Sequence, residues 1–102
     1  MDETCELPSF DLHVPDCALI LHSTKHSLKG QWKGKDVVIF DASSNQYDYQ
    51  IIKRMREEII ENMNKLENVQ QKETLQILVR WFNKKLQLQR LKKITALQLR
   101  NL

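Results

Sequence analysis

The stretch Ile51–Val69, IIKRMREEIIENMNKLENV, decides the fold class of this chain. Its apolar residues recur at steps of three and four, so at about 100° per residue they form one stripe along a helix. Charged residues occupy the other side of that helix. The stretch predicts an amphipathic helix with one buried face, whose packing residues are Ile52, Met55, Ile59, Met63 and Leu66.

Helix-breaking residues are confined to the first third of the 102-residue chain. Both glycines and both prolines precede residue 35, and residues 36–102 contain neither type. A helical region is therefore predicted over residues 43–102. Ser43 is the candidate cap of its first turn, because Ser43 and Gln46 have the spacing of a capping box.

The apolar pattern lapses between Gln70 and Thr74, which leaves two arrangements open. In the first, the chain turns near 68–73 and forms a helical hairpin, with Asn68 as a left-handed cap and Thr74 as the restart. In the second, one helix of about 58 residues, about 87 Å long, dimerises as a coiled coil. The lapse favours the hairpin, whereas the lack of glycine and proline favours the rod.

The first 42 residues read as extended structure rather than helix. Residues 1–16 are predicted to be an acidic, extended lead-in, because each of two prolines disfavours helix at the residue before it. Residues 17–42 are predicted to form a small antiparallel meander of two or three strands, over Cys17–His22, Asp36–Phe40 and a possible third strand at Ser27–Trp32. The expected fold class is α+β.

The second helical segment is apolar on two sides. One stripe is predicted to pack within the fold and contains Leu75, Leu78, Phe82 and Leu86. A second stripe, roughly 120° away, contains Ile77, Trp81 and Leu88. Because a helix with two apolar sides needs two partners, the second stripe is a candidate surface for another protein.

Positive charge is concentrated at the C-terminal end. Residues 74–102 hold seven basic residues and no acidic one, whereas residues 1–47 hold seven acidic residues against four basic ones. Such a segment is attracted to acidic surfaces. The predicted partner-binding residues are Ile77, Trp81, Leu88, Arg90, Leu91, Lys92, Lys93 and Ile94.

Motifs that carry catalysis or bind cofactors are missing from the sequence. It has no glycine-rich phosphate loop, no Gly-x-Ser-x-Gly elbow and no His-Glu-x-x-His helix. Cys5, His13, Cys17, His22 and His26 lie close together in the sequence, but their spacing matches no zinc finger. No enzyme activity, cofactor or metal site is expected.

The composition also bears on location. The longest apolar run, Cys17–Leu21, is far shorter than the roughly 20 residues that span a bilayer. The N-terminus is acidic, unlike a secretory or mitochondrial signal, and two cysteines are too few for a disulfide framework. A cytoplasmic or nuclear protein with no membrane span is expected.

One segment of the basic helix resembles a known recognition motif. Leu75-Gln76, Arg80, Lys85 and Leu88 have the spacing of an IQ motif, the helical target of calmodulin-type EF-hand proteins. Trp81 stands where that motif usually has glycine. The resemblance implies binding to an EF-hand protein as an alternative function.

The sequence therefore predicts a non-enzymatic adaptor or structural subunit, a scaffold component of an intracellular multiprotein assembly. Its partners would be proteins, in a hetero-complex or a homodimer formed through the C-terminal helices. Nucleic acid is a further alternative, because seven bases within 29 residues could neutralise phosphates. An acidic protein surface, such as a microtubule, would attract the same charge.

Overall fold

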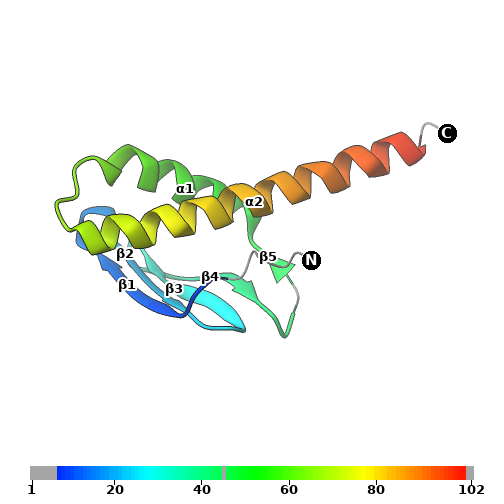
Figure 1. The fold of residues 1–102 in the computed structure, drawn as a ribbon. Helices are drawn as coiled ribbons and strands as arrows, with labels where there is room; N and C mark the ends of the chain where they lie inside the picture. Colours follow the sequence, from blue (N-terminus) through cyan, green and yellow to red (C-terminus); the bar gives the residue numbers. More distant parts are fainter. Residues whose placement is uncertain (1–6, 45, 101–102) are drawn as a thin grey trace.

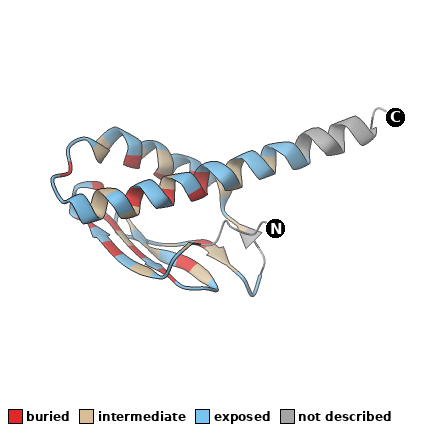
Figure 2. Cartoon of the chain, in the orientation of Figure 1, coloured by how far each residue is buried: buried red, intermediate tan, exposed pale blue. Residues whose placement is uncertain are grey.

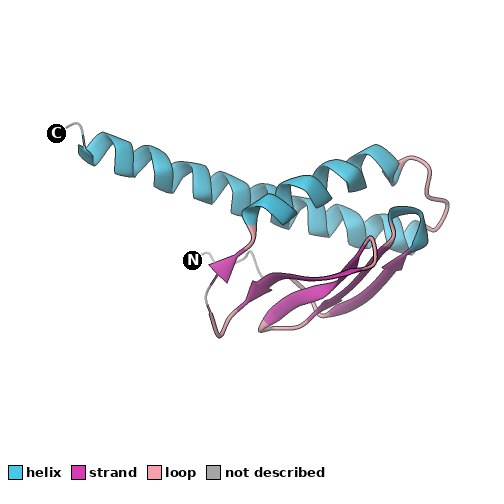
Figure 3. Ribbon diagram, turned by 180° about the vertical axis from the view of Figure 1, so that it is seen from behind, coloured by secondary structure: helices cyan, strands magenta, loops and turns pink. Residues whose placement is uncertain are grey.

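The chain forms a five-stranded antiparallel sheet and two helices that lie on one face of it (Figure 1, Figure 3). The computed structural model describes residues 7–44 and 46–100, and the side chains of 46 and 93–100 lie outside that description. In chain order the elements are β1 (Phe10–Val14), the 3-10 helix η1 (Pro15–Cys17), β2 (Leu19–Ser23), β3 (Ser27–Trp32), β4 (Lys35–Asp41), β5 (Gln46–Tyr47), α1 (Tyr49–Met63) and α2 (Val69–Arg100). The α+β class predicted from the sequence is confirmed.

The sheet is larger than the two or three strands predicted. Strands that follow one another in the chain are neighbours in the sheet, in the order β1-β2-β3-β4-β5. The additional strands are β1, inside the segment predicted to be a lead-in, and β5, inside the segment predicted to be helical. β1 alternates apolar and polar residues, FDLHV, and this period of two is typical of a strand with one buried face.

The chain between β1 and β2 explains why the second strand starts late. The backbone N–H of Ala18 donates to the carbonyl of Pro15 at 2.9 Å, which closes the single turn η1. Ala18 itself has a left-handed φ of 50°. The strand predicted from residue 17 therefore begins at Leu19, and Cys17 belongs to the turn.

A tight hairpin joins β3 to β4. Trp32 and Lys35 are paired across it, so only Lys33 and Gly34 form the loop. Both loop residues have positive φ, 55° and 79°, as a type I′ turn requires. This turn matches the right-handed twist of the two strands it connects.

Buried and exposed residues alternate along the strands (Figure 2), so that one face of the sheet is buried and the other is exposed. The residues of β1 to β4 that are buried under the helices include Leu12, Val14, Leu19, Leu21, Leu28 and Ile39. Their neighbours along the strands, such as Asp11, His22 and Lys29, are exposed on the opposite face. Side chains of one strand point alternately to the two faces, so one antiparallel sheet serves both as core wall and as solvated surface.

The first helix begins six residues later than predicted. Asp48 caps α1, because its Oδ1 accepts a hydrogen bond from the backbone N–H of Ile51 at 3.1 Å. Ser43, the cap predicted from sequence, instead donates from its backbone N–H and its hydroxyl to Oδ1 of Asp41, at 2.9 and 2.7 Å. These bonds lower the pKa of Asp41 and shape the turn that follows β4.

In the part of the chain that the structure describes, the helical region consists of α1 and α2 rather than one continuous rod. α1 ends at Met63, and α2 begins at Val69. Asn68 caps the start of α2, since its Oδ1 accepts from the backbone N–H of Gln71 at 3.0 Å. Asn68 had been predicted to end the first helix and Thr74 to start the second, but Thr74 lies inside α2, where its hydroxyl donates to the carbonyl of Gln70. Asparagine is favoured both at the start of a helix and at a left-handed position after its end, so the sequence pattern alone did not show which helix Asn68 caps.

The core lies between the two helices and the sheet. The two helices and their connection contribute Ile52, Met55 and Ile59 of α1, Leu66 of the connection, and Leu75, Leu78, Trp81 and Phe82 of α2. α2 contains 32 residues, which corresponds to about 48 Å. Its C-terminal part extends past α1 and past the sheet (Figure 1).

Candidate functional site

The outward side of α2 carries exposed apolar residues between positive charges. Ile77, Lys84, Leu88 and Leu91 follow one another at steps of seven, four and three residues, so they lie on one side of the helix. We call these four residues the outer stripe. Ile77 is 40 % exposed, Leu88 41 % and Leu91 52 %.

A groove between α1 and α2 adjoins this region. Its volume is about 560 Å³, and its walls include Lys53 and Arg56 from α1 and Asn83, Leu86 and Arg90 from α2. The guanidinium Nε of Arg56 donates to Oδ1 of Asn83, which ties the two helices together across the groove.

The groove has an excess of positive charge. Its lining has three cationic side chains, those of Lys53, Arg56 and Arg90, and one carboxylate, that of Glu57. The sequence pattern places Lys53 only on the charged side of the first helix and singles out no role for Arg56, because periodicity does not show which charged residues border a neighbouring helix.

Trp81 does not belong to the exposed surface, contrary to the prediction. It is 7 % exposed, and its ring lies 6.4 Å from that of Phe40, 6.0 Å from that of Tyr47 and 5.8 Å from that of Phe82. The stripe predicted to contain Ile77, Trp81 and Leu88 is therefore divided. Trp81 faces the sheet, because the sheet is wide enough to cover a second side of α2, whereas Ile77 and Leu88 remain exposed.

The other predicted partner-binding residues have different positions on α2. Arg90 and Lys92 are exposed, like Leu91. Lys93 and Ile94 are helical, but their side chains lie outside the described residues.

The predicted helix-packing residues lie in or beside the core. The buried ones are Ile52, Met55, Ile59, Leu66, Leu75, Leu78 and Phe82. Met63 and Leu86 are partly buried and pack against these residues.

The IQ-like segment is only partly accessible in this fold. Leu75 and Trp81 are buried, and the ammonium of Lys85 lies 4.8 Å from the ring centre of Tyr47 and 5.5 Å from that of Trp81. An EF-hand protein that surrounds this segment would first have to separate α2 from the sheet. That separation would expose much of the core.

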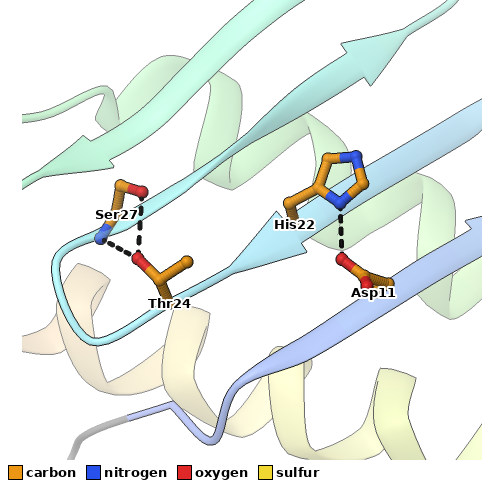
Figure 4. A network of polar contacts seen from close by, with 4 residues as sticks. All are labelled: Asp11, His22, Thr24 and Ser27. Atoms are coloured by element: carbon orange, nitrogen blue, oxygen red, sulfur yellow. Dashed lines mark hydrogen bonds and ion pairs between the residues drawn. The ribbon is translucent and has the colours of Figure 1, made fainter.

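The histidines and the described cysteine do not converge. His22 lies on the exposed face of the sheet, where its Nδ1 is 2.5 Å from Oδ1 of Asp11 (Figure 4). Cys17 is buried, and burial, with the nearby carboxylates of Glu58 and Asp16, raises the pKa of its thiol. Among the residues that the structure describes, no three His, Cys, Asp or Glu side chains are grouped so that they could hold a metal ion.

Within the described part of the chain, no helix is long and apolar enough to cross a bilayer. Comparisons of the sequence with protein-family models and with curated proteins gave no match, and comparison with solved structures gave none either.

Proposed function

We propose that this chain is a non-enzymatic adaptor or structural subunit of an intracellular protein assembly, and that it binds an acidic amphipathic helix of another protein through the outer stripe of α2. The observation that carries the proposal is the exposure of Ile77 and Leu88, at 40 % and 41 %, on a helix that extends beyond its own fold. Exposed apolar side chains at helical spacing are the usual anchors for a partner helix.

The charge of α2 favours a different protein over a second copy of the same chain. In a homodimer formed along this helix, the acid-free segment 74–102 would face an identical segment with seven bases. Like charges across an interface oppose association, whereas opposite charges speed it and select the partner. A partner helix with apolar anchors and flanking acidic residues would complement both the apolar positions and the bases.

The groove between the helices supports the same choice. Acidic side chains on the edge of a docked helix could reach Lys53, Arg56 and Arg90, while Lys84 lies within the outer stripe and Lys92 borders it. Exposed ion pairs contribute little free energy each, so the apolar anchors supply most of the affinity and the charges supply the selectivity.

The test uses the full chain and two synthetic helices. The first peptide has leucines at heptad a and d positions and glutamates at e and g positions, and the second has lysines in place of the glutamates. We expect the acidic peptide to bind with a Kd of about 10 µM or lower, and the basic peptide to bind at least about tenfold more weakly. Isothermal titration calorimetry measures both affinities.

Two variants make the test specific for the outer stripe. Ile77→Glu combined with Leu88→Glu should weaken binding of the acidic peptide at least about tenfold, without loss of helical circular dichroism. Val38→Glu is the matched control, because Val38 is an exposed apolar residue, 53 % exposed, on the sheet. Equal binding to the double variant and the control would contradict the proposal, as would failure of the acidic peptide to bind.

Salt dependence separates this proposal from nucleic-acid binding. The nucleic-acid alternative would be favoured by two results together. A labelled DNA duplex would bind the chain at about 50 mM salt and lose most of its affinity at about 200 mM, and the acidic peptide would not bind. Among the described aromatic residues, Trp81 and Phe82 are the two on the basic helix, and both are buried, so they do not provide a surface for base stacking.

A further inference from the structure

A second hollow lies between α2 and the sheet, and the proposed adaptor role makes no use of it. Its volume is about 210 Å³. One wall is apolar and consists largely of Leu28, Phe40, Tyr47 and Trp81. An apolar cavity of about 150 Å³ can hold a benzene ring, so this hollow has room for a ring with a short substituent.

The turn between β2 and β3 also lines the hollow, and several hydrogen bonds hold this turn (Figure 4). Oγ1 of Thr24 accepts from the backbone N–H groups of His26 and Ser27, both at 3.1 Å, and lies 3.2 Å from Oγ of Ser27. The backbone N–H of Thr24 donates to the carbonyl of Ser27 at 2.9 Å. This polar part of the lining is therefore well defined before any ligand enters.

Ser23, at the end of β2, adds a buried polar group to this hollow. The residue is 4 % exposed, and its hydroxyl has no hydrogen-bond partner among the described residues. A buried hydroxyl without a partner costs free energy, whereas alanine at that position would avoid the cost. This unpartnered hydroxyl is the kind of group that a bound acceptor would satisfy.

The two charged side chains in the described lining of the hollow are both positive. Lys85 of α2 and Lys25 of the β2–β3 turn both line it, and its described lining contains no acidic side chain. Lys85 is held above the rings of Tyr47 and Trp81, at 4.8 and 5.5 Å from their centres. The ammonium group thus lies beside the apolar wall rather than away from it.

We propose that this hollow binds a carboxylate attached to an aromatic or similarly sized apolar group. The apolar group would lie against Phe40 and Trp81, and the carboxylate would accept hydrogen bonds from Lys85 and from the hydroxyl of Ser23. A charge-assisted hydrogen bond to an ammonium is among the stronger polar contacts, which favours a carboxylate over a neutral acceptor. The same chemistry occurs in free arylacetic acids and in a protein C-terminus that ends in phenylalanine.

The primary probe is phenylacetate, with phenylacetamide as its neutral control. Amide chemical shifts of the full chain, measured by two-dimensional NMR, report where each compound binds. We expect phenylacetate at about 1 mM to shift the signals of Ser23, Ser27 and Lys85 and the indole signal of Trp81, and phenylacetamide to bind at least about tenfold more weakly. Equal affinity for the acid and the amide would overturn the proposal, and so would the absence of shifts at these residues.

Lys85→Gln and Lys84→Gln form a matched pair for the charge. The two residues are adjacent on α2, and Lys85 lines the hollow whereas Lys84 belongs to the outer stripe. Phenylacetate affinity should fall at least about tenfold in Lys85→Gln and stay within about twofold in Lys84→Gln. Equal losses in the two variants would show a nonspecific effect of charge and contradict the proposal.

Ser23→Ala provides a separate readout of the unpartnered hydroxyl. Its unfolding temperature without ligand should equal or exceed that of the original chain, while its affinity for phenylacetate should fall severalfold. An unchanged affinity would remove Ser23 from the proposed site. Retained affinity in both Ser23→Ala and Lys85→Gln would overturn the site as a whole.

Peptides that end in phenylalanine distinguish the two sources of the carboxylate. If the hollow receives a protein C-terminus, a peptide with a free terminal carboxylate should bind more tightly than phenylacetate, and its amidated form should not bind. If the ligand is a small molecule, phenylacetate should bind more tightly than the peptide. Neither result depends on the outer stripe, so the double variant Ile77→Glu, Leu88→Glu should bind phenylacetate normally.

Discussion

Single residues decide how closely the strands of this sheet approach one another. Gly30 of β3 is paired with Leu21 of β2, and a Cβ at Gly30 would lie 1.9 Å from the carbonyl oxygen of Ile20. That oxygen belongs to backbone, so it cannot move aside without a shift of the strand. Gly34 differs, because its φ of 79° favours glycine but no atom lies within 4 Å of a Cβ placed there.

We therefore predict different costs for two alanine substitutions. Gly30→Ala should lower the free energy of unfolding by about 3 kcal/mol, since β2 and β3 must separate locally. Gly34→Ala should lower it by about 1 kcal/mol, the usual cost of a left-handed conformation with a side chain. Urea denaturation measures both, and a larger loss for Gly34→Ala would contradict this account of Gly30.

At the scale of elements, α2 has a side that holds the fold together and a side that does not. Trp81 packs among Phe40, Tyr47 and Phe82, whereas Ile77, one turn earlier, is 40 % exposed. Both residues are large and apolar, so hydropathy alone treats them alike. Their different environments arise because the sheet covers one side of α2 and leaves the other open.

This difference predicts that replacing Trp81 or Ile77 by alanine has unequal effects on the free energy of unfolding. Trp81→Ala should lower the free energy of unfolding by about 3–5 kcal/mol, because it leaves a cavity among packed rings. Ile77→Ala should change it by less than about 1 kcal/mol, as is usual for a surface position. Thermal and urea unfolding of the two variants would check the assignment, and a large loss for Ile77→Ala would show that the outer stripe is part of the core.

At the scale of the whole molecule, the stable body and the extension of α2 should be separable. In the described residues, the last α2 side chain packed against the core is Leu86, and the helix continues past the sheet to Arg100. The Cα radius of gyration, 14.8 Å, and the longest extent, 52 Å, reflect this extension. Stability is thus expected to depend on residues before 87, and partner binding on residues on both sides of it.

A chain shortened to end at Lys92 tests that separation. We expect its free energy of unfolding to stay within about 0.5 kcal/mol of the full chain, because no described core residue is removed. Its affinity for the acidic peptide should fall, since the shortened chain lacks bases and turns of helix that the peptide would contact. A large loss of stability would show that the end of α2 supports the fold.

Much of the fold follows from patterns within short stretches of sequence. The amphipathic stretch 51–69 predicts α1 and its buried residues, although the helix ends at Met63 and Leu66 packs into the core from the connection. Ser27–Trp32 corresponds to β3 as predicted. β1 was missed although its alternation is clear in FDLHV, because the prolines on either side of it suggested irregular structure. The cap of α1 was misplaced because Ser43 and Asp48 are both good capping residues, and local sequence does not rank them.

The sequence by itself determined the helical character of the segments 49–63 and 69–100, the α+β class and the concentration of positive charge in the last 29 residues. Those features depend on residue type and on periods of a few residues, which are visible without a partner. Only the tertiary structure decided that Trp81 is buried while Ile77 is exposed, and that Ser23, Tyr47 and Lys85 border one hollow. Those relations join residues far apart in the chain, and they depend on the width and twist of a five-stranded sheet, which no local pattern encodes.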